Sequence, residues 1–132
     1  AVDVAIQVAK AFDSELIIIS VVDERYPAIY TPVGVGAPAL DYSQFIGAAE
    51  RDAKQIVDEA VQKAKKESAN ASGEAMRTVS SVVECIIDKA DNEAADLIIM
   101  GTRGLGGFKR LLLGSVSSGV VSHANCAVLV VR

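Results

Sequence analysis

The sequence predicts an α/β fold: an open, parallel, five-stranded sheet with helices on both faces. Short runs rich in Ile and Val, typical of strands buried on both faces, alternate with amphipathic segments of helical period. Such alternation implies right-handed crossovers between parallel strands. A glycine-rich segment between a strand and a helix, near the end of the chain, points to a Rossmann-like arrangement.

The composition is that of one globular domain. The chain has 132 residues, of which 51% are hydrophobic and 23% are charged, and this length suffices to bury a core. A pI of about 4.9 argues against nucleic acid as a general partner. Without a signal-peptide pattern or a long apolar run, we expect a cytoplasmic protein that does not enter a membrane. Cys85 and Cys126 lie far apart, which argues against a disulfide or zinc framework.

The first half of the chain is expected to form two helices and one strand. Residues 2–12 have apolar side chains at helical spacing, and residues 15–22 form a continuous apolar run typical of a strand. Residues 23–43 contain three prolines and are expected to be a loop. Residues 44–69 have the pattern of a long amphipathic helix. Its predicted buried stripe comprises Phe45, Ala49, Ala53, Ile56, Ala60 and Ala64.

The second half is expected to contribute three further strands and two helices. Residues 74–80 alternate as a short strand, and the capping box at residues 81–84 opens a helix. A second buried strand spans residues 96–100, a helix spans residues 114–124, and the last strand spans residues 127–131.

The chain begins inside a helix, whereas a doubly wound unit begins with a strand. We therefore expect residues 1–132 to be a single domain whose first strand is absent from this sequence. A sheet without that strand is expected to be unstable or to be completed by another chain.

The segment from Met100 to Ser117 predicts an anion site. Its glycines allow close approach of the backbone to a ligand, and the free N–H groups of the following helical turn favour negative charge. All 17 acidic residues precede this segment's first glycine, Gly101. The charged residues that follow it are Arg103, Lys109, Arg110 and Arg132.

The glycine spacing is Gly101, two residues, Gly104, nine residues, and then Gly114 followed by Ser115. This pattern resembles the nucleotide-binding signature of the universal stress protein family, and the resemblance extends over nearly the whole chain. It implies the fold of the adenine nucleotide alpha hydrolases and a homodimer that pairs through the strand Ala127–Val131. The family also uses an Asp after its first strand, and this sequence has no corresponding segment.

By this resemblance, the expected ligand is ATP accompanied by Mg²⁺ or Mn²⁺. Val21 would contact adenine, and serine hydroxyls and backbone N–H groups would bind phosphate oxygens. The residues expected to surround the nucleotide are Val21, Met100, Gly101, Thr102, Gly104, Gly114, Ser115, Val116 and Ser117. Ser115 also fits the N-cap of the following helix.

The expected function is nucleotide-dependent binding or signalling in a stress response. The sequence has no P-loop and no evident general base, so we assign no catalytic residue and expect at most slow ATP hydrolysis. An interaction module of the same fold that does not bind ATP, and a small phosphoryl-hydrolysing enzyme, remain alternatives. Asp23 fits either a turn or a phosphate-bound metal, and His123 is expected to contact helix-terminal carbonyls.

Overall fold

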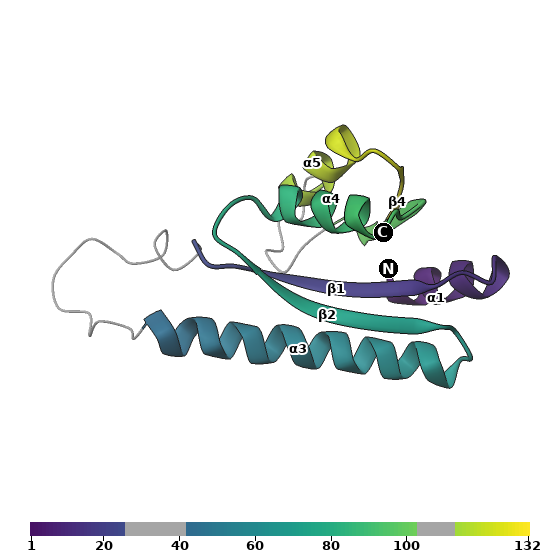
Figure 1. Ribbon diagram of the computed structural model, residues 1–132, viewed down its shortest axis with the longest axis horizontal. Coiled ribbons are helices and arrows are strands. Elements are labelled where there is room, and N and C mark those ends of the chain that lie inside the picture. The colour runs from purple at the N-terminus through teal and green to yellow at the C-terminus, as the bar shows by residue number, and fades with distance from the viewer. Residues whose placement is uncertain (26–41, 103–112) are drawn as a thin grey trace, which may run out of the picture.

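The computed structural model describes residues 1–25, 42–102 and 113–132, in which helices and strands alternate (Figure 1). This alternation confirms the α/β class. The elements, in chain order, are α1 (Val2–Ala11), β1 (Leu16–Asp23), α3 (Tyr42–Lys66), β2 (Ala71–Thr78), α4 (Val82–Asn92), β3 (Leu97–Gly101), α5 (Ser115–His123) and β4 (Ala127–Val131).

The four described strands form two separate parallel pairs. β1 pairs with β2 from Leu16 opposite Ala71 onward, and β3 pairs with β4 from Leu97 opposite Ala127 onward. The prediction of one five-stranded sheet is therefore wrong for the described residues, because no backbone ladder among them joins the two pairs. Apolar periodicity locates strands but does not determine which of them pair.

The helices cover the sheets from both sides (Figure 1). α3 packs along β1 and β2 on one side, and α4 contacts β1 and α5 on the other. α1 contacts both β1 and β3, so it bridges the two sheets. Among the described helices, none is long and apolar enough to span a membrane.

The core lies where α1 and the end of α3 meet the start of β1. Ile6 and Ala64 are completely buried, and Leu16 and Ile18 pack against the cluster that contains them. On α3 the predicted stripe is partly wrong, because Phe45 and Ile56 are 43% and 50% exposed. The predicted burial of Ala53, Ala60 and Ala64 is confirmed. Ile46 and Val57 are buried on the same face, at helical spacing, in place of Phe45 and Ile56.

The connection from α3 to β2 lies earlier in the chain than the sequence predicts. α3 ends at Lys66, the chain turns at Ser68 with a φ of 64°, and β2 already begins at Ala71. Gly73 therefore lies inside the strand, where an added Cβ would be 2.4 Å from the nearest Val57 methyl carbon. The missing side chain lets α3 approach β2 closely.

The Ser81 half of the capping box that opens α4 is confirmed. Ser81 is the N-cap residue, and its hydroxyl oxygen accepts a hydrogen bond of 3.4 Å from the backbone N–H of Glu84. This bond satisfies one of the free donors at the start of the helix.

Candidate functional site

The end of β3 and the start of α5 meet at the predicted anion site. Gly101 is the last residue of β3, and the carbonyl of Thr102 accepts a hydrogen bond of 2.7 Å from the backbone N–H of Gly114. The residue at the N-cap of α5 is Gly114, in an extended conformation with φ −74° and ψ 168°. The assignment of Ser115 as N-cap is therefore wrong, because Ser115 already belongs to the first helical turn.

The start of α5 carries backbone donors that the helix itself leaves free. The first hydrogen bond within the helix runs from the N–H of Ser118 to the carbonyl of Gly114, at 2.9 Å. The N–H groups of residues 115–117 therefore have no partner inside α5. Within the described residues, no side chain caps this end, and the first turn holds no acidic residue. The helix dipole adds to this local positive potential, which suits an anion.

The two candidate serines have different surroundings. Ser115 is exposed, and Val116, between them, is half-buried. Ser117 is only 2% exposed, and its hydroxyl lies 3.1 Å from the carbonyl oxygen of Thr102 and 3.0 Å from that of Gly114. The hydroxyl of Ser115 is thus available to a ligand, whereas that of Ser117 is engaged with the backbone.

Among the other candidate residues, hydrogen bonds link Thr102 and Gly114 to the start of α5. Met100 and Gly101 are half-buried in β3, opposite Val130 and Val131 of β4. Val21 lies on β1 in the other sheet, opposite Met76 of β2. Gly104 and the basic residues Arg103, Lys109 and Arg110 lie outside the described residues.

Asp23, at the end of β1, forms a local turn with Arg25. Its Oδ1 accepts hydrogen bonds of 2.9 Å from the backbone N–H and the Nε of Arg25, and its Oδ2 accepts one of 2.8 Å from Nη2. These bonds lower the pKa of Asp23 below its ordinary value. Both carboxylate oxygens are occupied, so the structure favours the turn over a metal ligand. The described ranges contain no group of three or more His, Cys, Asp or Glu residues that could hold a metal ion.

A polar network beside this turn is absent from the sequence predictions. Arg77 of β2 pairs with Glu24 at 3.1 Å and with Glu50 of α3 at 3.6 Å. The hydroxyl of Tyr42 donates to the carbonyl of Glu24 at 2.7 Å. These residues come from three separate parts of the chain, namely the turn after β1, helix α3 and strand β2, so no local pattern in the sequence connects them.

His123 contacts the backbone as predicted. Its Nδ1 lies 2.9 Å from the carbonyl oxygen of Gly119, one turn earlier in α5. An imidazole in the last turn of a helix can donate to such a carbonyl and interact favourably with the helix dipole. The contact accounts for this histidine without a catalytic role.

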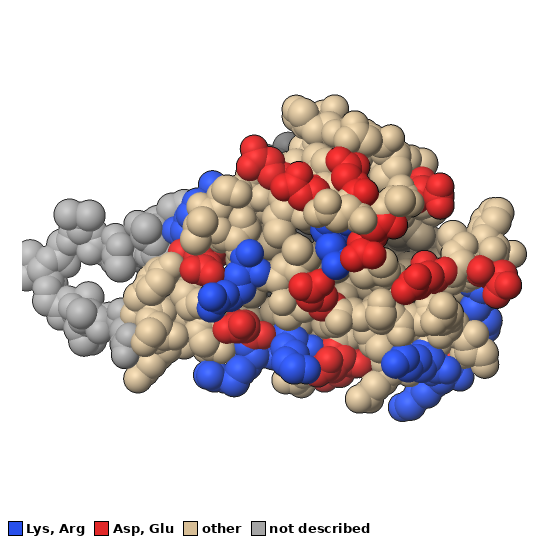
Figure 2. All heavy atoms as spheres, viewed as in Figure 1, with Lys and Arg blue, Asp and Glu red and all other residues tan. Residues whose placement is uncertain are grey.

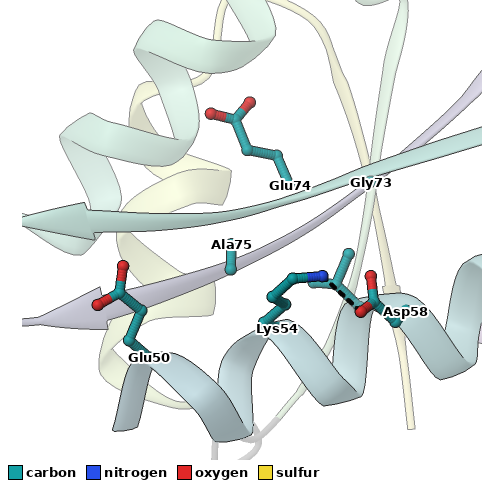
Figure 3. A pocket seen from close by; sticks show the side chains of 7 residues that line it. Glu50, Lys54, Asp58, Gly73, Glu74 and Ala75 are labelled. Carbon is teal, nitrogen blue, oxygen red and sulfur yellow. Dashed lines mark hydrogen bonds and ion pairs between the residues drawn. The ribbon is translucent and has the colours of Figure 1, made fainter. Parts of the chain in front are cut away.

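A hollow of about 290 Å³, separate from the junction of β3 and α5, lies between α3 and β2 (Figure 3). Lys54 projects along it and forms an ion pair with Asp58 at 2.6 Å. The other two charged residues that line it, Glu50 and Glu74, are paired with Arg77 and Lys89. Since each lining charge has a partner, the hollow leaves no unpaired charge to attract an ionic ligand.

Basic and acidic side chains are interspersed over the face shown in Figure 2. Basic side chains gather at the C-terminal end of α3, where Lys63, Lys65 and Lys66 occupy the last turn. Cations at this position interact favourably with the helix dipole. This basic cluster therefore has a structural explanation that does not involve a ligand.

Comparison with known proteins finds relatives in both sequence and fold. The model of the universal stress protein family matches residues 1–132. A universal stress protein of Methanocaldococcus jannaschii is 37% identical over 130 residues, which cover 97% of this chain and 71% of the relative. The solved structure of the universal stress protein UspA from Lactobacillus plantarum has a TM-score of 0.79 and 28% identity, and the match covers 98% of this chain and 86% of that one.

A third match is the crystal structure of a universal stress protein in complex with cAMP. It has a TM-score of 0.61 and 28% identity, and the match covers 100% of this chain and 84% of that one. The family model spans the entire sequence, and the relatives share both its sequence and its fold. This chain therefore belongs to the universal stress protein family.

Proposed function

We propose that this protein binds ATP at the junction of β3 and α5. The observation that carries the proposal is the uncapped start of α5, where free backbone donors and an exposed serine stand next to the end of a parallel strand. Ligands of open α/β folds bind at this edge of the sheet. The complex of a 28% identical universal stress protein with cAMP supports an adenine nucleotide as the ligand class.

The residues at this junction fit a phosphate chain. The N–H groups and hydroxyl at the start of α5 would bind phosphate oxygens, and Gly114 would leave space for them. Adenine would lie against Val21, and Gly104 would contribute main chain. The remaining members of the proposed site are Met100, Gly101, Thr102, Ser115, Val116 and Ser117.

Mg²⁺ or Mn²⁺ would be held mainly by the triphosphate, whose charge it would neutralise. The described residues contain no group of three carboxylates, thiols or imidazoles to bind the ion on their own. The sequence also offers no evident general base for this site. The site therefore favours nucleotide-dependent signalling in a stress response over rapid hydrolysis.

We further propose that the protein acts as a cytoplasmic homodimer that pairs through β4. Among the described strands, β4 pairs only with β3 and so has one free edge. Leu129 in this strand is 38% exposed. A short apolar edge strand is protected from aggregation when a second copy covers it.

Binding of Mg-ATP to the wild type and to Gly114→Val tests the proposed site. The φ of −74° at Gly114 is open to any residue, so valine should be accommodated in the fold while its side chain fills the phosphate space. A ligand at 100 times its Kd stabilises a folded protein by about 2.7 kcal/mol, which a thermal-unfolding scan detects. We expect such a stabilisation for the wild type and not for Gly114→Val.

The control variant is Gly47→Ala on α3, a helix that packs on the other sheet, and it should bind Mg-ATP as the wild type does. GTP and AMP serve as comparison ligands. Equal affinity of folded Gly114→Val and wild type would refute the site. A wild type that melts cooperatively but is not stabilised by any nucleotide would favour the interaction module instead.

A further inference from the structure

Ser117 occupies an unusual position for a ligand-binding serine. Its side chain is on the buried side of α5 and is 2% exposed, whereas Ser115 in the same turn is exposed. Its hydroxyl lies within hydrogen-bond distance of two backbone carbonyls, those of Thr102 and Gly114. The single hydroxyl hydrogen can serve either carbonyl or be shared between them.

These two carbonyls belong to the two sides of the β3–α5 junction. Thr102 directly follows β3, and Gly114 directly precedes α5. Thr102 also receives the N–H of Gly114 at 2.7 Å, and its own N–H donates to the carbonyl of Val131 on β4 at 3.0 Å. The start of α5 is thus hydrogen-bonded to Thr102, and Thr102 is hydrogen-bonded to β4.

We infer that Ser117 is a positioning residue of the nucleotide site. Its hydroxyl holds the start of α5 against Thr102 and so fixes the direction of the free N–H groups that would face phosphate. The inference rests on the proposed function and deepens it, because it separates two roles: Ser115 contacts the ligand, and Ser117 acts through the backbone. Donors held in place before the ligand arrives lose less freedom on binding.

The test compares Ser117→Ala with Ser118→Ala, a neighbouring serine that is exposed and whose hydroxyl is not part of this junction. Loss of one hydrogen bond is expected to weaken binding of Mg-ATP about fivefold in Ser117→Ala. Adenosine has no phosphate, so its affinity should remain unchanged. Ser118→Ala should bind both ligands normally. Ser117→Thr, which retains the hydroxyl, should restore binding of Mg-ATP.

Amide hydrogen exchange in the ligand-free protein separates positioning from direct contact. If Ser117 orders the junction, exchange at the Gly114 N–H should be about fivefold faster in Ser117→Ala and unchanged in Ser118→Ala. Unaltered exchange at Gly114 with weakened binding of Mg-ATP would indicate direct contact with phosphate and overturn the inference. Equal losses for ATP and adenosine would overturn it as well, because they would indicate a general structural defect.

Failure of the proposed function gives a different result. If the wild type binds no nucleotide, the proposed nucleotide site is refuted, and Ser117 then has no role in binding. Exchange at Gly114 would still respond to Ser117→Ala in that case, so the two failures are distinguishable.

Discussion

Replacement of Gly73 by alanine is expected to destabilise the protein through the contact between β2 and α3. An added Cβ would lie 2.4 Å from Val57 Cγ1, 2.6 Å from Val61 Cγ2 and 3.1 Å from the carbonyl oxygen of Ile18. Valine side chains have little freedom at χ1, so they cannot turn away at low cost. The helix and the strand would have to separate.

The size of the effect follows from two opposing contributions. Overpacking of a core costs about 1–3 kcal/mol. Replacement of glycine within a strand recovers roughly 0.5–1 kcal/mol, because the unfolded chain loses conformational freedom. The net loss of unfolding free energy should be about 1 kcal/mol. With a slope of about 2 kcal/mol per molar urea, the unfolding midpoint should fall by about 0.5 M.

The matched control is Gly47→Ala, another replacement of glycine by alanine. Its Cβ would meet only Arg51 Nη1, at 3.5 Å, which is an ordinary contact. Because Gly47 lies inside α3, alanine should stabilise the protein by about 0.5–1 kcal/mol. Urea unfolding followed by circular dichroism measures both variants. A midpoint of Gly73→Ala at or above that of the wild type would refute the close approach of β2 and α3.

Three further predictions concern single side chains. Asp23→Asn should lower the melting temperature at pH 7. The hydrogen bonds from Arg25 lower the pKa of this carboxyl in the folded state, so its stabilisation is present above the unfolded pKa of about 3.9 and is lost as the pH falls through the lower folded value. The difference in melting temperature between the wild type and Asp23→Asn should therefore shrink as the pH falls below about 3.9, and a difference that does not change with pH would contradict the lowered pKa. Ser81→Ala should reduce the unfolding free energy by about 1 kcal/mol through loss of the α4 cap, and an unchanged urea midpoint would contradict the capping bond. Burial raises the pKa of the Cys85 thiol. In a Cys126→Ser variant, where Cys85 is the one remaining cysteine, Cys85 should therefore react with iodoacetamide at pH 8 more slowly than a small-molecule thiol. A rate equal to that of the free thiol would count against this burial.

The sequence predicted local features well where neighbours along the chain determine them. The capping bond of Ser81 depends on a residue three positions away, and the contact of His123 depends on a carbonyl four positions away. By contrast, the buried stripe of α3 was displaced toward Phe45 and Ile56. Several faces of that helix carry apolar side chains, and only the packed sheet selects which of them is buried.

At the candidate site, too, the sequence predicts local features but not the contacts between distant residues. The glycine spacing and the absence of acidic residues after Asp96 predict an anion site at the start of α5 from the sequence alone. The different surroundings of Ser115 and Ser117 were not predictable, because two residues on one helical turn point in different directions and only the neighbouring backbone decides which is covered.

The sequence by itself determined the alternation of helices and strands, because this depends on periodicity, and its glycine spacing indicated the family. That the same glycine segment binds phosphate stays a prediction. Tertiary structure alone decided the pairing of four strands into two sheets, the network around Arg77, and the burial of Ser117 against Thr102. Each of these depends on contacts between residues far apart in the chain, and such contacts form only when whole elements pack together.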